Sequence, residues 1–385
     1  MKNRSLKIVA DQNMPLVEAL FGRWGEVRLL PGRSISAEEV ADADVLLVRS
    51  VTSVSSSLLE NSRVKFVGSA TIGIDHVDTG FLNNSGIRFA FAPGCNAKAV
   101  VQYDLSVMSR LMPNWQNQTV GIIGCGNVGG LLYSTLEALG VSCRVYDPFL
   151  PKNGRIPLDG FNEVLQSDIV CLHTPLTFLG LHPTYHLINR AALEILRPDA
   201  LLINAGRGEV VDTETLLEKL RSGMPLSVAL DVWESEPNVC SDLLKHVAIA
   251  TPHIAGYTLE GKTKGTTMVF DAFLAWLEVK EDYVDHVSSA PIKINSLPIT
   301  SAIEAILASY DVLDDDQIMR QRLTGLPKGS VEQRDMFDAM RREYPERRGF
   351  ESTIVHSSDH LGKTKLKRDL AALGFLASGH AEKAL

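Results

Sequence analysis

Three charged residues stand near the ends of apolar runs and have the types that acid–base chemistry requires. Arg207 follows "LLINAG", Glu236 lies just past "LDVW", and His253 follows the run at 247–250 in "TPHIAGY". A histidine, with an ordinary pKa of about 6.5, can take a hydroxyl proton as a carbonyl forms. A carboxylate beside it fixes its tautomer, and an arginine fork binds a substrate carboxylate and polarises a nascent ketone. The three residues predict a site that oxidises a hydroxy acid.

The segments that position these side chains are predicted to be parallel strands. From Thr119 onward, six apolar runs alternate with helical stretches: "TVGIIG", "VSCRVYD", "SDIVCLHTP", "ALLINAG", "LSVALDVW" and "HVAIATPH". Short, uninterrupted apolar runs are typical of strands covered on both faces. Ligands bind beyond the carboxyl ends of such strands. Taken singly, the arginine could be an ion-pair partner, the glutamate a turn residue and the histidine a cap, but their convergence on one edge favours a site.

The first of these strands runs directly into a glycine motif. "GCGNVGG" gives G-x-G-x-x-G after a strand and at the start of a helix. Gly124 allows the tight turn, Gly126 lets a pyrophosphate approach the backbone, and Gly129 lets the helix pack on the strand. With Asn127 and Val128 they would present free N–H groups and the positive end of the helix dipole to phosphate. The alternative is a glycine-rich turn without a ligand.

Two further strand ends suit the same cofactor. Asp147 ends the next strand, 18 residues after Gly129. A carboxylate there accepts hydrogen bonds from ribose hydroxyls and repels a 2′-phosphate, which favours NAD over NADP. Thr174, in "LHTP", is either a cofactor contact or a simple turn residue.

The rest of the chain indicates an α/β fold with more than one domain. The first hundred residues carry the strand-like runs "KIVAD", "DVLLVRS", "VKFVGSA" and "IRFAFAP" between helical stretches. Two long helical segments, at 96–113 and 261–279, would connect the two lobes. We expect two Rossmann-like doubly wound domains flanking a cleft, plus a small α+β C-terminal dimerisation domain. The expected boundaries are 1–95 with 258–285 for a substrate domain, 96–257 for an NAD domain, and 286–385 for the C-terminal domain.

Composition excludes several function classes. With 46 acidic and 38 basic residues the net charge is −8, which argues against a nucleic-acid partner. The N-terminus lacks a signal-peptide core, and no apolar run approaches the length of a membrane span, so a cytoplasmic location is expected. The five cysteines are scattered without metal-ligand spacing, so we expect them to be reduced and predict no metal site.

The ordered set of motifs resembles the D-isomer-specific 2-hydroxyacid dehydrogenases. The glycine motif, "NAGRG", "DVWESEP" and "TPH" match the family pattern in order, within a resemblance that covers residues 1 to about 285. It implies NAD as cofactor, His253 as the acid/base, Glu236 as its partner and Arg207 as the anchor of the substrate carboxylate and carbonyl. It also implies that Asp231 contacts the nicotinamide side of the cofactor or caps a helix, and that Gly256 contacts the cofactor.

Other stretches resemble one branch of that family. They are "ADQNMP", "VRSVTSVSSSLL", "KFVGSATIGIDHVD", "APGCNAKAVVQY" and "HIAGYTLEGKTKGTT". Members of this branch oxidise a phosphorylated four-carbon 2-hydroxy acid in pyridoxal phosphate synthesis and dimerise through a C-terminal extension. The resemblance implies that Ser50, Thr71 and Tyr257 contact substrate and that the chain is a homodimer.

A phosphorylated substrate needs cations at its site. Arg49 stands at the end of "DVLLVRS", where ligands are expected, and Arg347 and Arg348 precede a predicted strand in the tail. The tail pair could reach the site of a partner subunit. Alternatively, Arg49 pairs with a local acid and the tail arginines are solvated.

Two other functions stay open. The substrate could be another hydroxy acid such as 3-phosphoglycerate, or the chain could be a dinucleotide-sensing, corepressor-like protein, which would not need the acid–base set.

Overall fold

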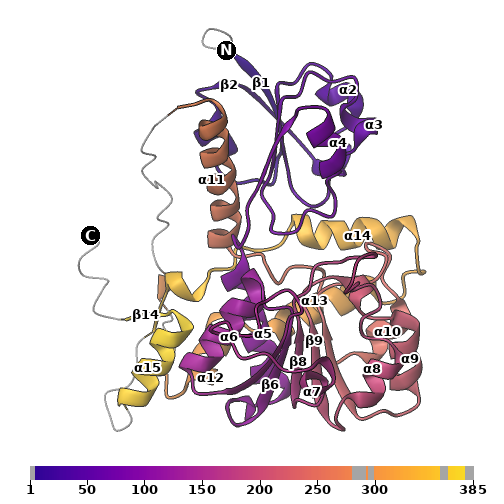
Figure 1. Cartoon of the computed structure of the whole chain (residues 1–385), viewed down its shortest axis with the longest axis vertical. Coiled ribbons are helices and arrows are strands. Elements are labelled where there is room, and N and C mark those ends of the chain that lie inside the picture. Colours follow the sequence, from indigo (N-terminus) through magenta and orange to yellow (C-terminus); the bar gives the residue numbers. More distant parts are fainter. Residues whose placement is uncertain (1–4, 280–291, 294–298, 356–362, 378–385) are drawn as a thin grey trace. The chain divides into compact units, whose positions relative to one another are not determined.

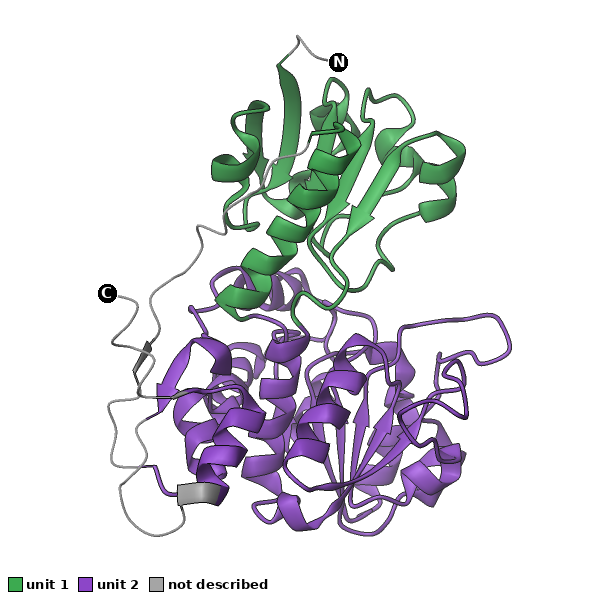
Figure 2. Ribbon diagram, turned by 60° about the vertical axis from the view of Figure 1, so that its left-hand side comes forward, with its two compact units in different colours: residues 1–96, 258–289 green, residues 97–257, 290–385 purple. Residues whose placement is uncertain are grey.

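The structure, a computed structural model, describes residues 5–279, 292–293, 299–355 and 363–377. The chain forms two compact units (Figures 1 and 2). The first unit comprises residues 1–96 and 258–289, and the second comprises residues 97–257 and 290–385.

The first unit is built on a five-stranded parallel sheet in the order β2-β1-β3-β4-β5. Its strands are β1 (Leu6–Asp11), β2 (Gly25–Leu30), β3 (Val45–Val48), β4 (Phe66–Ser69) and β5 (Arg88–Phe91). Its helices are α1 (Val17–Phe21), α2 (Ala37–Val40), α3 (Ser56–Leu59), α4 (Thr79–Asn84) and α11 (Leu259–Trp276). The four predicted strands are confirmed as β1, β3, β4 and β5.

Strand β2 was not predicted. It lies at the edge of the sheet beside β1 and alternates between half-buried and exposed residues, with Glu26 and Arg28 among them. An edge strand of this kind lacks the uninterrupted apolar run that identifies a central parallel strand. The central strands have that run because both faces are covered: Val45 and Leu47 pack into one core, and Leu46 and Val48 into the other.

The second unit contains a six-stranded parallel sheet in the order β11-β10-β9-β8-β6-β7, which confirms the six predicted strands. The strands are β6 (Thr119–Ile123), β7 (Ser142–Tyr146), β8 (Ile169–Leu172), β9 (Ala200–Asn204), β10 (Leu226–Leu230) and β11 (Ile249–Ala250). The helices between residues 97 and 257 are α5 (Ala97–Leu111), α6 (Asn127–Ala138), α7 (Phe161–Leu165), α8 (Arg190–Ile195), α9 (Thr213–Arg221) and α10 (Ser241–His246).

Residues 290–385, the C-terminal segment, complete the second unit. The segment contains α12 (Ala302–Ser309), α13 (Val312–Leu323), α14 (Val331–Arg342) and α15 (Lys363–Leu373). A small parallel sheet joins β12 (Ile292–Lys293), β13 (Thr353–Val355) and β14 (Leu376–Ala377).

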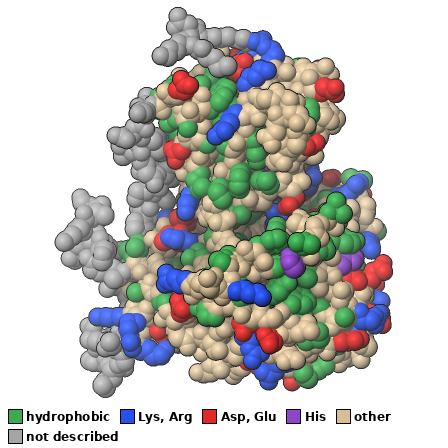
Figure 3. All heavy atoms as spheres, viewed as in Figure 1, with side chains coloured by type: hydrophobic (Ala, Val, Ile, Leu, Met, Phe, Trp, Pro, Cys, Tyr) green, Lys and Arg blue, Asp and Glu red, His purple; other side chains and the backbone are tan. Residues whose placement is uncertain are grey.

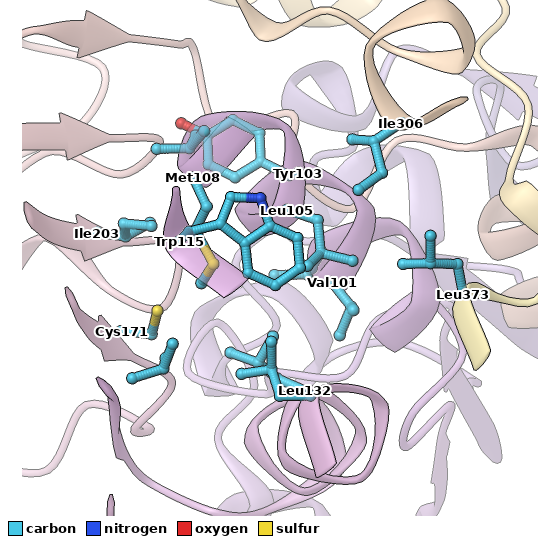
Figure 4. Close-up of a cluster of buried hydrophobic side chains, with 14 of the residues drawn as sticks. Val101, Tyr103, Leu105, Met108, Trp115, Leu132, Cys171, Ile203, Ile306 and Leu373 are labelled. Carbon is cyan, nitrogen blue, oxygen red and sulfur yellow. The ribbon is translucent and has the colours of Figure 1, made fainter. Parts of the chain in front are cut away.

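The C-terminal segment shares the cores on both faces of the six-stranded sheet. On one face, Ile306 and Leu373 belong to the cluster of Trp115, Tyr103 and Leu132 (Figure 4). On the other face, Met319, Leu323, Phe337 and Met340 join the side chains that cover β8, β9 and β10. The segment is therefore an integral layer of the second unit.

The surface carries both signs of charge. On the face drawn in Figure 3, the acidic and basic side chains of the described residues are interspersed. Among the described residues, no helix combines the length and apolar character that crossing a membrane would require.

Candidate active site

The glycine loop between β6 and α6 has the geometry that its sequence predicts. Gly124 lies in the left-handed region, with φ of +88°, and a Cβ there would press against His173. At Gly129 a Cβ would overlap the carbonyl oxygen of Gly124, so the helix and strand can approach closely only with glycine. Gly126 is different, because it is exposed and a Cβ on it would meet nothing. The backbone there is open to a phosphate at the N-terminus of a twelve-residue helix, whose first residues are Asn127 and Val128.

Two side chains beside this loop fit a dinucleotide. The Asp147 carboxylate accepts a hydrogen bond from the backbone N–H of Cys125 at 2.9 Å and another from that of Phe149 at 3.0 Å. Each oxygen keeps a lone pair for a ribose hydroxyl. Within the described residues, the buried hydroxyl of Thr174 has no hydrogen-bond partner. A buried hydroxyl without a partner is uncommon, and a bound cofactor group would satisfy it.

His253 and Glu236 form a hydrogen-bonded pair. The ring Nδ1 of His253 lies 2.8 Å from Oε2 of Glu236, and the other carboxylate oxygen accepts the backbone N–H of Trp233 at 2.8 Å. The side chains are 30% and 20% exposed, so both can meet a substrate. Burial raises the pKa of Glu236, but His253, Arg341 and the Trp233 N–H outweigh it and lower that pKa overall. The carboxylate therefore holds Nδ1 and leaves Nε2 for chemistry.

Asp231 holds the loop that carries His253. It is 1% exposed, and its carboxylate accepts hydrogen bonds from the Thr251 hydroxyl and from the backbone N–H groups of Ile254 and Ala255, at 2.7 to 2.9 Å. Its backbone carbonyl also accepts the N–H of His253. His253 has φ of +57°, which a residue other than glycine rarely adopts. The contacts of Asp231 hold His253 in that conformation, so its carboxylate acts on the loop.

Arg207 lies beyond the carboxyl end of β9, the neighbour of β10 in the sheet. Its side chain is half-buried, and Nη1 donates to the carbonyl of Gly206 at 2.9 Å. The amide of Asn204 fixes the turn, since it donates to the carbonyl of Arg207 and accepts the N–H of Gly206. Arg207 also interacts with Glu209, whose pKa is raised by burial and by the carboxylates nearby. Arg207, Glu236 and His253 thus follow three adjacent strands at one edge of the sheet.

The substrate residues predicted from the first unit lie at the carboxyl edge of its own sheet. Arg49 follows β3, and its Nε lies 3.2 Å from the buried carboxylate of Asp11, the last residue of β1. The alternative that Arg49 pairs with a local acid thus agrees with the structure. Ser50 is exposed. The hydroxyl of Thr71 donates to the carbonyl of Gly73 at 2.8 Å and contacts the hydroxyl of Ser69 at 2.7 Å.

The tail arginines do not behave as solvated side chains. Arg347 and Arg348 are only 6% and 7% exposed, so that interpretation is wrong. The guanidinium of Arg347 donates to the carbonyls of Ala99 and Ala255 and lies 4.3 Å from the centroid of the Tyr310 ring. Arg347 thus fastens the C-terminal segment to its own chain, close to the loop that carries His253.

One residue near the acid–base pair was not predicted. Arg341, in the last turn of α14, interacts with Glu236 and with Tyr257. Tyr257 itself lies two residues after Ala255, in the same loop as Gly256, and its ring meets that of Tyr344 edge to face. A single arginine in an amphipathic helix belongs to no motif, so it could not be predicted from the sequence.

Comparison with known proteins places these features in a family. The profile of the "D-isomer specific 2-hydroxyacid dehydrogenase, NAD binding domain" matches residues 99–255, which identifies NAD as the cofactor of this domain. A second profile, described only as a domain of unknown function, matches residues 288–374.

Curated relatives match nearly the whole chain. The erythronate-4-phosphate dehydrogenase of Teredinibacter turnerae is 45% identical over 96% of this chain and 98% of its own. The enzyme of that name from Pseudomonas aeruginosa is 41% identical over 96% and 99%.

Solved structures share the fold. The NAD⁺-bound 3-phosphoglycerate dehydrogenase of Entamoeba histolytica aligns with a TM-score of 0.61 at 22% identity, over 71% of this chain and 96% of its own. The D-lactate dehydrogenase of Aquifex aeolicus, complexed with NAD and lactic acid, gives 0.59 at 20% identity over the same fractions.

Proposed function

Since the chain belongs to the D-isomer-specific 2-hydroxyacid dehydrogenase family, among the erythronate-4-phosphate dehydrogenases, we propose that it oxidises 4-phospho-D-erythronate at C2. The product is (R)-3-hydroxy-2-oxo-4-phosphooxybutanoate, an intermediate of pyridoxal 5′-phosphate synthesis. The named relatives support this substrate over nearly the full length of the chain. The observation that carries the reaction class is the hydrogen bond between Glu236 and Nδ1 of His253 at the edge that also holds the glycine loop.

Proton transfer is the task of His253. NAD, when bound, accepts the hydride that leaves C2. The substrate hydroxyl then has to lose its proton, and Nε2 is the free nitrogen of the ring because Nδ1 bonds to Glu236. The carboxylate stabilises the imidazolium that results and keeps the ring in this orientation. In the reverse direction the same ring returns the proton.

Substrate recognition is assigned to charged and hydroxyl groups. We assign Arg207 to the substrate carboxylate and nascent carbonyl, because its planar fork matches a carboxylate. Arg49, Ser50 and Thr71 are proposed contacts from the first unit, and Tyr257 is a proposed contact from the second. For the cofactor, the glycine loop is assigned to the pyrophosphate and Asp147 to the ribose. Thr174, Asp231 and Gly256 are assigned to the rest of the bound cofactor.

A turnover assay with NAD tests the substrate. The panel is 4-phospho-D-erythronate, D-erythronate, D-3-phosphoglycerate and D-lactate, followed by NADH absorbance. We expect the highest kcat/KM for 4-phospho-D-erythronate, with D-erythronate as the matched control that lacks only the phosphate. A higher kcat/KM for D-3-phosphoglycerate would assign that acid as the substrate. If none of the acids is turned over, a dinucleotide-sensing protein would be the better description.

Two finer expectations belong to the same proposal. We propose that the enzyme is a homodimer through its C-terminal segment, where Leu313, Ile318 and Val331 are exposed hydrophobic side chains that a partner could cover. The sedimentation coefficients of the wild type and of the double variant Leu313→Asp/Ile318→Asp test this. We expect a dimeric wild type and a monomeric variant, and a monomeric wild type would contradict the proposal.

A cytoplasmic location suits the five cysteines, all of which are free thiols.

A further inference from the structure

The C-terminal segment is fastened to the strands and helices that carry the catalytic loops. Ser106 of α5 accepts the N–H of Val312 and donates to the carbonyl of Tyr310, both at about 3 Å. At the sheet edge, the N–H of Ala250, the last residue of β11, donates to the carboxylate of Asp316 at 2.7 Å. These contacts fix α13, and α14 packs on α13 (Figure 1). Side chains of α14 therefore have a defined place beside the loop that follows β11.

Arg341 is a buried side chain of α14 that lies against Tyr257, in the loop that follows the catalytic histidine. It is 9% exposed, and its guanidinium carbon lies 5.8 Å from the ring centroid of Tyr257 and 5.9 Å from that of Phe337. Its charge also attracts the carboxylate of Glu236 and lowers the pKa of that group. One buried arginine thus packs on a proposed substrate residue and acts through its charge on the partner of the catalytic histidine.

The surroundings of Arg341 differ from those of Arg320, a structural arginine of α13. Arg320 bonds to the carboxylate of Asp316 and to two carbonyl oxygens. The Nε of Arg341 is buried and has no hydrogen-bond partner within the described residues. The carboxylate that it attracts, Glu236, already accepts bonds from His253 and Trp233. Burial opposes the positive charge, but Tyr257 and Glu236 outweigh it and raise the pKa of Arg341.

We propose that Arg341 is a positioning residue of the active site, which holds the ring of Tyr257 in place and supplies a buried positive charge to the Glu236–His253 pair. One role of the C-terminal segment, which matches a domain of unknown function, is then to supply Arg341 to the site. The inference deepens the proposed function and rests on it for the identity of the substrate. The effect of Arg341 on the Glu236–His253 pair does not depend on that substrate, because it is present in the free enzyme as well.

The direction of the pH effect follows from the charges around Glu236. His253 and Arg341 both favour its carboxylate, whereas Glu209, which follows β9, repels it. Removing the charge of Arg341 raises the pKa of Glu236. The carboxylate is then protonated at a higher pH, and the hydrogen bond to Nδ1 of His253 weakens there. The acid limb of the kcat/KM profile should move to higher pH.

The experiment compares four variants. Arg341→Met and Arg341→Gln remove the charge, Arg341→Lys keeps it, and Arg342→Met is the matched control, since Arg342 is the next residue of the same helix and is exposed. We expect both neutral variants to lower kcat by roughly 10- to 100-fold, the scale of a misplaced catalytic group. Their acid limb should move up, with NAD affinity unchanged, and the lysine should restore the position of the limb. Tyr257→Phe should cost less in the Arg341→Met background than in the wild type.

A measurement without substrate separates this inference from the proposed function. In ¹⁵N-histidine spectra assigned with His253→Gln, the hydrogen bond from Nδ1–H to Glu236, followed by its downfield proton signal, should weaken as the pH is lowered, and at a higher pH in Arg341→Met than in Arg342→Met. Equal pH dependence in the two variants overturns the inference, even if the wild type oxidises 4-phospho-D-erythronate. An inactive wild type with the expected spectral shift overturns the substrate assignment alone.

Folding is monitored by thermal melting and NAD binding. If both neutral variants fail to fold, Arg341→Lys decides. A lower kcat with wild-type melting and NAD affinity supports the positioning role. The acid limb and the spectra of the lysine variant should stay as in the wild type because the charge is kept, so kcat is the quantity that decides. A wild-type kcat in the lysine variant would make Arg341 a structural residue.

Discussion

The carboxyl edges of the two parallel sheets are alike in topology and different in chemistry. At the edge of the six-stranded sheet, the backbone takes left-handed conformations at Gly124 and His253, and the Glu236–His253 pair follows β10 and β11. At the edge of the five-stranded sheet, Arg49 pairs with the buried Asp11. Strand topology places loops at both edges, but the side chains decide what each edge can do.

The difference indicates a division of labour. The second unit carries an open glycine backbone, a buried hydroxyl that has no partner among the described residues, and a carboxylate whose pKa is lowered, which suit a cofactor and a proton. The edge of the first unit offers the guanidinium of Arg49 and the hydroxyl groups of Ser50 and Thr71, which suit recognition of an anionic sugar acid. Substitutions in the Glu236–His253 pair should therefore change kcat, and those at the first edge should change substrate preference.

The largest effect is expected for His253→Ala. Loss of the proton acceptor should lower kcat by roughly two to four powers of ten, the usual contribution of a general base. NAD affinity should stay near the wild-type value, because the glycine loop and Asp147 do not depend on this side chain. Steady-state kinetics and NAD titration calorimetry measure the two quantities. An unchanged kcat would remove His253 from the mechanism.

Arg207→Lys should have the next largest effect. An ammonium keeps the charge but cannot reproduce the planar fork, so kcat/KM should fall by roughly 10- to 100-fold, the range of one charged hydrogen bond. Arg221 provides a matched control, because it lies on the surface and pairs with Asp242. Were Arg207→Lys as active as Arg221→Lys, the carboxylate anchor would have to lie elsewhere.

Arg49→Ala tests the first edge. If Arg49 binds the phosphate, the variant should lose about 1.5–3 kcal/mol of binding to 4-phospho-D-erythronate and almost nothing with D-erythronate. The variant also leaves Asp11 without its cation, which costs stability. Asp11→Asn controls for this, because it breaks the ion pair and keeps the charge of Arg49. Equal losses with both substrates would make Arg49 structural.

The sequence predicts those parts of the molecule that depend on local pattern. Uninterrupted apolar runs identify the central strands, and the glycine spacing identifies the loop between β6 and α6. The rule for strand ends predicts that Arg207, Glu236 and His253 lie at one edge of the sheet. Each of these inferences needs only residues that are close together in sequence.

The remainder depends on contacts between distant segments. Strand β2 is stabilised mainly by its pairing with β1, so its own residues carry little apolar signal. Asp231 could be a cofactor contact or a cap from its sequence, and only the three hydrogen bonds to its carboxylate show that it holds the loop. Arg341 meets Tyr257 because α13 and α14 fold back on the sheet, and no spacing along the chain encodes that contact.

The smallest effect is expected for Asp147→Asn, at the ribose end of the second edge. The asparagine oxygen can still accept the N–H of Cys125, so the glycine loop should keep its shape while the negative charge is lost. Without that charge, a 2′-phosphate is no longer repelled, and kcat/KM with NADP should rise about tenfold, or about 1.4 kcal/mol. Kinetics with NAD serve as the control and should change less. If NADP stays excluded while NAD kinetics are normal, cofactor choice rests on the shape of the pocket and the charge of Asp147 has no part in it.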